Sequence, residues 1–119
     1  NYFSVIDMMP TIAKICGITK VLNTVEGKDV SDYLLNNNNF KNTIYVRGHI
    51  QESIITAPWK LIRTRSRTNE TQYELYNLET DSYETYNVAN KNPSILLELK
   101  KQLNQQFSLD SKTVNLSLP

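Results

Sequence analysis

The sequence predicts an α+β fold: a small antiparallel sheet of three or four strands with a long C-terminal helix packed on it. Four runs rich in β-branched and aromatic residues, which are typical of strands, follow one another between residues 43 and 78. Beyond them, apolar residues recur at steps of three and four, the spacing of one helix face. A shorter helical pattern precedes the strands, near the N-terminus.

The N-terminal pattern begins with the spacing of a capping box between Ser4 and Asp7, with Asp in place of the usual Glu or Gln. We expect a helix over Pro10 to Cys16, preceded by a helical lead-in from Ser4 to Met9. Because Pro10 lacks a backbone donor, it either lies in the first turn of this helix or kinks it. Gly17 follows where a C-terminal cap is expected.

The middle of the chain carries the strand signals. We expect a short helix over Val30–Leu35 and then strands over Thr43–Arg47, Glu52–Thr56, Lys60–Thr64 and Tyr73–Leu78. The second and third strands flank Ala57-Pro58-Trp59, so they are predicted to form a hairpin. Residues 65–71 have no apolar member and are predicted to be a loop.

The long helix is predicted to start at Asn92-Pro93, with Asn as the N-cap and Pro in the first helical position. We expect it to run from about Pro93 to Phe107 and to lie across one face of the strands. From Ser108 the sequence has no helical pattern, although alternating apolar residues at 114–118 could add an edge strand. The residues of the apolar stripe are Leu96, Leu99, Leu103 and Phe107.

Charge and composition narrow the classes of partner. The formal net charge is +1, so bulk electrostatics suggest neither nucleic acid nor a membrane surface. No apolar run approaches the roughly 20 residues that span a bilayer. The basic stretch of Lys60, Arg63, Arg65 and Arg67 lacks the interleaved aromatic residues of a nucleic-acid platform, and we interpret it as a solvated strand face. The one cysteine, Cys16, closes an apolar helix stripe and is expected to be buried.

Few residues could carry chemistry. His49 is the only histidine, so a metal site of several histidines is impossible. It lies between Arg47 and Glu52 in a polar segment that interrupts the strands, and the simplest interpretation is a surface loop. We expect the carboxylates of Asp81 and Glu84 to accept hydrogen bonds from the backbone of a turn, rather than to act as a glycosidase pair.

Four phrases of the chain carry a family resemblance. The first is Asp-x-x-Pro-Thr ending in Gly-Ile, within Ser4–Ile18, and the second is Gly-Lys leading to Leu-Leu, within Glu26–Leu35. The third is Trp-Lys-Leu-Ile, within Ile55–Ile62. The fourth and longest, within Tyr73–Ala89, is Glu-Leu-Tyr-Asn-Leu-Glu-x-Asp-x-x-Glu-x-x-Asn-x-Ala. In this order they resemble sulfatases, members of the alkaline-phosphatase-like superfamily. The chain departs from the pattern at Ser82-Tyr83, where Pro-Gly is common, and at Ile55, where Arg is common.

The resemblance implies that the chemistry lies outside this chain. Sulfatases hydrolyse sulfate esters with a formylglycine made from a Cys/Ser-x-Pro-x-Arg motif, and Asp and Asn residues hold a divalent cation, usually calcium. In the family these motifs precede the Asp-x-x-Pro-Thr helix, with which this chain begins. We therefore expect the C-terminal portion of a sulfatase, with residues 1–35 as the end of the catalytic α/β domain and 36–119 as the smaller α+β subdomain. This portion alone is expected to be inactive.

The same resemblance suggests partners. The first partner is the missing N-terminal catalytic domain, and the substrate of the whole enzyme would be a sulfated small molecule or carbohydrate in the periplasm or outside the cell. Arg47 and His49 could bind a sulfated or carboxylated sugar by charge-assisted hydrogen bonds. Without its catalytic domain, the apolar face of the first helix would be exposed, so we expect self-association. That face consists of Ile6, Met9, Ile12 and Ala13.

Two alternatives stay open. The chain could be a non-catalytic α+β interaction module, which a start codon just before Asn1 would favour. It could also be the same subdomain of a phosphonate or phosphodiester hydrolase of the superfamily. That enzyme would differ from a sulfatase in residues upstream of this chain.

Overall fold

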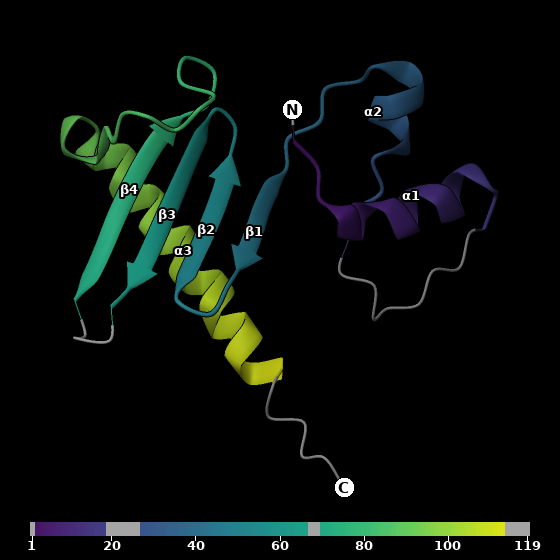
Figure 1. Cartoon of the computed structure of the whole chain (residues 1–119). Helices are drawn as coiled ribbons and strands as arrows, with labels where there is room; N and C mark the ends of the chain where they lie inside the picture. Colours follow the sequence, from purple (N-terminus) through teal and green to yellow (C-terminus); the bar gives the residue numbers. More distant parts are fainter. Residues whose placement is uncertain (1, 19–26, 67–69, 114–119) are drawn as a thin grey trace, which may run out of the picture. The chain divides into compact units, whose positions relative to one another are not determined.

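The computed structural model of the chain describes residues 2–18, 27–66 and 70–113 (Figure 1). The chain divides into two compact units, Asn1–Ile44 and Tyr45–Pro119, which we call the N-terminal unit and the C-terminal unit. The predicted α+β fold, an antiparallel sheet with a long C-terminal helix, is confirmed. The assignment of residues 1–35 to a catalytic domain stays a prediction, because the two units reflect contacts within this chain alone.

The N-terminal unit starts with a single turn of 3-10 helix, η1 (Val5–Asp7), that continues directly into helix α1 (Met8–Ile15). The backbone N–H of Ser4 donates to the Asp7 carboxylate at 2.8 Å, as the predicted capping box requires. Helix α1 thus begins two residues earlier than expected, and Pro10 lies in its first turn, where a missing N–H costs nothing. Gly17 has a φ of 76° just after the helix, the conformation of a C-terminal glycine cap.

A buried polar clamp holds the segment after residue 26 against α1. The Asp7 carboxylate accepts hydrogen bonds from the backbone N–H of Lys28 at 2.8 Å and from the Asn42 side chain at 3.1 Å. The Thr11 hydroxyl donates to the Asp7 carbonyl at 2.6 Å and accepts from the Val30 N–H at 3.0 Å. Asp and Thr of the Asp-x-x-Pro-Thr phrase therefore have a structural role here.

The clamp continues into the short helix α2 (Ser31–Asn36). The Asp29 carboxylate accepts a hydrogen bond from the Ser31 N–H at 2.8 Å, which satisfies one of the free donors at the start of this helix. Asn37, with a φ of 54°, ends the helix in the left-handed conformation. The predicted helix over Val30–Leu35 is confirmed, shifted by one residue at each end.

Replacing Gly27 by alanine is expected to destabilise the N-terminal unit by about 1–3 kcal/mol. A Cβ at this position would lie 1.9 Å from the Ile6 carbonyl oxygen, so the clamped segment would have to move away from η1. The measurement is native-state hydrogen exchange of the Lys28 and Val30 amides, which should become faster. Gly48→Ala is the control, because its Cβ would meet its nearest atom, the Gln51 carbonyl oxygen, at 3.2 Å. Unchanged exchange in Gly27→Ala would contradict the clamp.

The sheet has the strand order β1-β2-β3-β4 (Figure 1). The strands are β1 (Thr43–Arg47), β2 (Gln51–Thr56), β3 (Trp59–Arg65) and β4 (Thr71–Asn77). The predicted hairpin is confirmed, with the Cα atoms of Thr56 and Trp59 paired across the turn. The predicted loop over 65–71 was too long, because Arg65 and Thr71 pair as the last residues of β3 and the first of β4. Polar residues extend these strands because cross-strand backbone hydrogen bonds do not require apolar side chains.

Helix α3 (Pro93–Thr113) crosses one face of the sheet (Figure 1). It ends six residues beyond the predicted Phe107, so the end predicted from the apolar stripe was wrong. The extra turns contain no Gly or Pro, and an established helix propagates at little cost through such residues. The predicted edge strand at 114–118 lies outside the described residues. The buried core between helix and sheet consists of Ile54, Leu61, Leu75, Ala89, Leu99 and Leu103.

Candidate functional site

The loop after β4 contains the acidic residues of the longest family phrase. Asp81 accepts hydrogen bonds from the backbone N–H groups of Tyr86 at 2.8 Å and Thr85 at 2.9 Å, and from the Thr85 hydroxyl at 2.9 Å. The expectation that the Asp81 carboxylate accepts hydrogen bonds from the backbone of a turn is confirmed. These hydrogen bonds hold the pKa of the Asp81 carboxyl below its ordinary value of 3.8, and the bond from the Tyr86 N–H has the largest effect.

Because the pKa of Asp81 is lowered in the folded state, the free energy of unfolding should fall as the solution becomes more acidic. The contribution of Asp81 to stability is complete above the unfolded pKa, near 3.8, and is lost as the pH falls through the lower folded pKa. We expect NMR titration of the side-chain carboxyl to give a midpoint below 3.8. Asp81→Asn should remove this part of the acid sensitivity, measured as the change of the unfolding midpoint with pH. A titration midpoint at or above 3.8 would refute the hydrogen-bonded turn.

Two further contacts attach this loop to the sheet. The Lys60 ammonium on β3 donates to both carboxylate oxygens of Glu84 at 2.7 Å, and Glu84 has a φ of 57°. Glu84 thus binds a side chain instead of the predicted backbone amides. The Asn87 side-chain oxygen accepts from the backbone N–H groups of Leu75 at 3.1 Å and Ala89 at 3.0 Å. The loop residues of this phrase are therefore engaged in holding the fold.

Three arginines and a glutamate gather around one aromatic ring on the α3 face of the sheet. We call this group the arginine cluster, and it comprises Arg47, Glu52, Arg63, Arg65 and Phe107. The Cα atoms of Glu52 and Arg63 pair across β2 and β3, and the Arg63 guanidinium donates to Glu52 through both Nε, at 2.8 Å, and Nη2. Each of these two side chains is only 6% exposed. They form a buried ion pair at the base of the cluster.

The other two arginines lie at the surface of the cluster. The Arg65 Nη2 atom is 3.4 Å from the same Glu52 oxygen, and the Arg47 Nε atom is 3.7 Å from the other oxygen. Their side chains are 44% exposed for Arg47 and 45% for Arg65. The buried carboxylate thus orients two guanidinium groups that also reach solvent.

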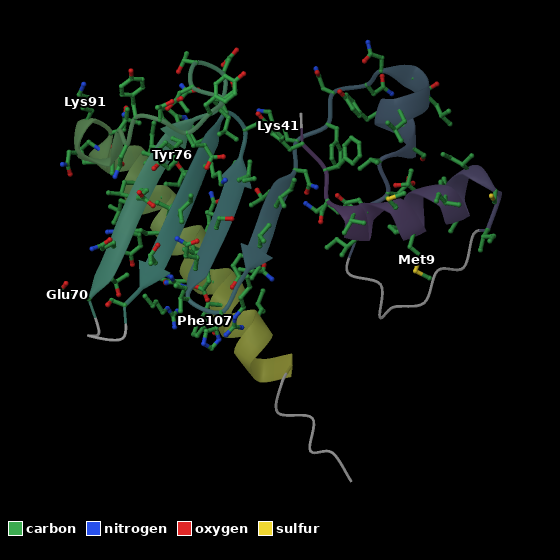
Figure 2. All side chains as sticks on the ribbon, viewed as in Figure 1. Met9, Lys41, Glu70, Tyr76, Lys91 and Phe107 are labelled. Carbon is green, nitrogen blue, oxygen red and sulfur yellow. The ribbon has the colours of Figure 1, made fainter. Side chains whose placement is uncertain are left out.

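Phe107 on α3 completes the cluster. The guanidinium carbons of Arg65, Arg47 and Arg63 lie 4.4, 4.9 and 5.6 Å from the centre of its ring. Figure 2 shows the nitrogen-bearing side chains gathered around this labelled ring. Contact between guanidinium groups and an aromatic face is favourable, so the ring restricts the positions of the arginines.

The structure separates the two residues predicted to bind substrate. Arg47 lies in the arginine cluster, whereas His49 lies in the exposed turn between β1 and β2. The sequence interpretation missed Arg65 and Phe107 as neighbours of Arg47. Arg63 and Arg65 alternate on one strand, which could have indicated a shared face. The apolar stripe places Phe107 on the strand side of the helix, but neither pattern brings it next to the arginines.

Two further predictions, for the basic stretch and for Cys16, can be compared with the structure. The basic stretch is not simply a solvated face, because Arg63 is buried and paired with Glu52. Cys16 is exposed, contrary to expectation, because α1 ends there with its apolar side uncovered among the described residues. Trp59 packs against the core between helix and sheet.

Within residues 2–18, 27–66 and 70–113, no group of three or more His, Cys, Asp and Glu side chains is arranged to hold a metal ion. The calcium site that the sulfatase resemblance implies is expected upstream of this chain, so it stays a prediction. None of the helices in the described part of the chain has the length and apolar character that a membrane crossing needs.

No protein-family model and no curated protein matches the sequence. Solved structures do match it. The Bacteroides fragilis protein yidJ, assigned as a sulfatase, aligns with 86% of this chain at 19% identity and a TM-score of 0.70. The chain has the fold of part of a sulfatase. It spans about a quarter of that protein, 24% of its length.

Two other matching structures contain sugars. BT4656, solved with its substrate D-glucosamine-2-N,6-O-disulfate, aligns with 84% of this chain at 19% identity and a TM-score of 0.64. Ps i-CgsB, solved with k-i-k-neocarrahexaose, aligns with 84% at 23% identity and a TM-score of 0.69. This chain covers 23% of each of them. The similarity to sulfatases is thus established at the level of the fold.

Proposed function

We propose that this chain is the C-terminal portion of a sulfatase. The observation that carries the proposal is the fold match over 84–86% of this chain, to proteins of which it spans only about a quarter. The contacts of the family-phrase residues support it, because Asp7, Lys60 and Glu84 each join segments that are distant in the sequence. In this proposal the chain supports the enzyme and walls its cleft, and the reaction takes place elsewhere.

The chemistry would be supplied by the part of the enzyme upstream of this chain. There we place the formylglycine, made from a Cys/Ser-x-Pro-x-Arg motif, and the calcium ion. We propose a sulfated carbohydrate as substrate, because one structural neighbour was solved with a sulfated glucosamine as its substrate. We further propose that the enzyme works in the periplasm or outside the cell.

The test is to read the coding sequence upstream of Asn1. The proposal expects a Cys/Ser-x-Pro-x-Arg motif in the same open reading frame, within the roughly three quarters of the enzyme that this chain does not span. A start codon immediately before Asn1 would contradict it and favour the non-catalytic interaction module. Upstream metal and nucleophile residues of another type would favour a phosphonate or phosphodiester hydrolase.

The N-terminal unit also presents a surface that suits a partner domain. Helix α1 and the turn before it expose apolar side chains, each more than half accessible: Val5, Ile6, Met8, Met9, Ile12 and Ile15. A contiguous apolar surface of this kind usually marks a protein interface. In our proposal the upstream catalytic domain covers it.

Without that domain, the chain is expected to self-associate through α1. Light scattering over a concentration series should give a mass that rises above the monomer. Ile12→Lys, which puts a charge on the exposed apolar face, should shift the chain towards the monomer. Leu97→Lys is the control, because Leu97 is 70% exposed on α3 in the other unit. A strictly monomeric mass for the unmodified chain at all concentrations would contradict the expectation.

A further inference from the structure

The arginine cluster has the features of an anion subsite. We propose that the guanidinium groups of Arg47 and Arg65 bind a sulfate group of a sulfated sugar, on a platform formed by Glu52, Arg63 and Phe107. The identity of the anion rests on the proposed function. The existence of the subsite rests on the geometry of the C-terminal unit alone.

The buried ion pair of Glu52 and Arg63 positions the guanidinium groups of the outer arginines. Arg63 directs Nε and Nη2 to Glu52 and Nη1 to the Asn104 side-chain oxygen on α3, at 2.6 Å for the last contact. The Arg63 side chain is therefore buried and held by these contacts. Glu52 in turn contacts the guanidinium groups of Arg47 and Arg65 with its two oxygens. Arg63 and Glu52 are thus positioning residues, and the two half-exposed arginines are the ligand-binding ones.

The charges in the cluster favour an anion. Three guanidinium groups approach one carboxylate and one aromatic ring, so positive groups lie close to one another. An oxyanion bound to the outer two would offset part of this positive charge. The planar guanidinium is suited to this role, because its N–H groups can donate in parallel to two oxygens of one anion. Sulfate presents such oxygens.

Phe107 and the strand register limit the freedom of the two arginines. Arg65 lies 4.4 Å and Arg47 lies 4.9 Å from the centre of the ring, so both guanidinium groups are in contact with the same aromatic side chain. A long side chain that is already held loses less conformational freedom when it binds a ligand. The cluster is therefore better prepared for an anion than separate surface arginines would be.

The experiment is an NMR titration of the whole chain with D-glucosamine-2-N,6-O-disulfate, observing the Nε–H signals of the arginines. We expect the Arg65 and Arg47 signals to shift, and unsulfated glucosamine to leave them unchanged. Arg65→Gln and Arg47→Gln should each weaken binding about tenfold, since each removes charge-assisted hydrogen bonds. Both residues are half-exposed, and the amide spectrum verifies that each variant is folded.

Lys91→Gln is the matched control, because it removes a positive charge from an exposed residue far from Phe107 in Figure 2. It should leave binding unchanged, whereas an equal loss in Lys91→Gln would overturn the subsite. Absence of any shift with the sulfated sugar would overturn it as well. Shifts with inorganic sulfate as large as those with the sugar would overturn the assignment to a sugar. Because the upstream coding sequence tests the proposed function separately, either proposal can fail without the other.

Discussion

Leu103→Ala is expected to lower the free energy of unfolding of the C-terminal unit by about 2–5 kcal/mol. Leu103 is fully buried on α3, against the core residues of the sheet. Truncation would remove apolar contacts and leave a cavity that close-packed neighbours fill only in part. Urea denaturation followed by fluorescence measures the loss, because Trp59 is the only tryptophan and packs against this core.

The control for this prediction lies on the same helix. Leu97 is 70% exposed, so Leu97→Ala should change the free energy of unfolding by no more than about 0.5 kcal/mol. Both variants replace leucine by alanine in α3, so helix propensity cancels between them. Equal losses for the two variants would contradict the placement of α3 on the sheet.

Glu52→Ala is expected to cost about 3–5 kcal/mol, because it leaves the buried Arg63 guanidinium without its carboxylate. The remaining guanidinium groups around Phe107 would also lose the negative charge that they share. The same fluorescence-monitored urea denaturation measures the effect. Glu79→Ala, at an exposed position of the loop after β4, is the control and should be close to neutral.

A double variant separates the cost of breaking the pair from the value of the pair itself. Glu52→Leu combined with Arg63→Met replaces both charges by apolar groups, so no buried charge is left without a partner. We expect it to recover most of the stability lost in Glu52→Ala. If Glu52→Ala unfolded at the same urea concentration as the unmodified chain, the buried ion pair would be refuted.

The fold could be predicted from the sequence because its signals are local. Runs of β-branched and aromatic residues, helical patterns, the residues around Ala57-Pro58 and the cap before Pro93 each depend on neighbours within a few positions. The errors fell at the ends of elements. Helix α3 passes Phe107 and β3 reaches Arg65, because backbone hydrogen bonding continues where side-chain patterns stop.

The candidate site could be predicted only in part. Arg47 was predicted to bind a sugar, and that role stays a prediction; its neighbours in the arginine cluster come from β2, β3 and α3. That assembly depends on the register that pairs Glu52 with Arg63 and on the turn of α3 that carries Phe107. No local pattern encodes either of these. For the same reason the contact between Lys60 and Glu84, which joins two family phrases, became apparent only in the structure.

We propose that this chain supports a sulfatase whose reaction occurs in the upstream part of the protein. The most direct measurement compares hydrolysis of an aryl sulfate by the longer protein, expressed with its upstream sequence, and by this chain alone. We predict turnover by the longer protein and none by the chain. Sulfate release by the chain alone, or no release by a folded longer protein from aryl sulfates and sulfated sugars alike, would contradict the account.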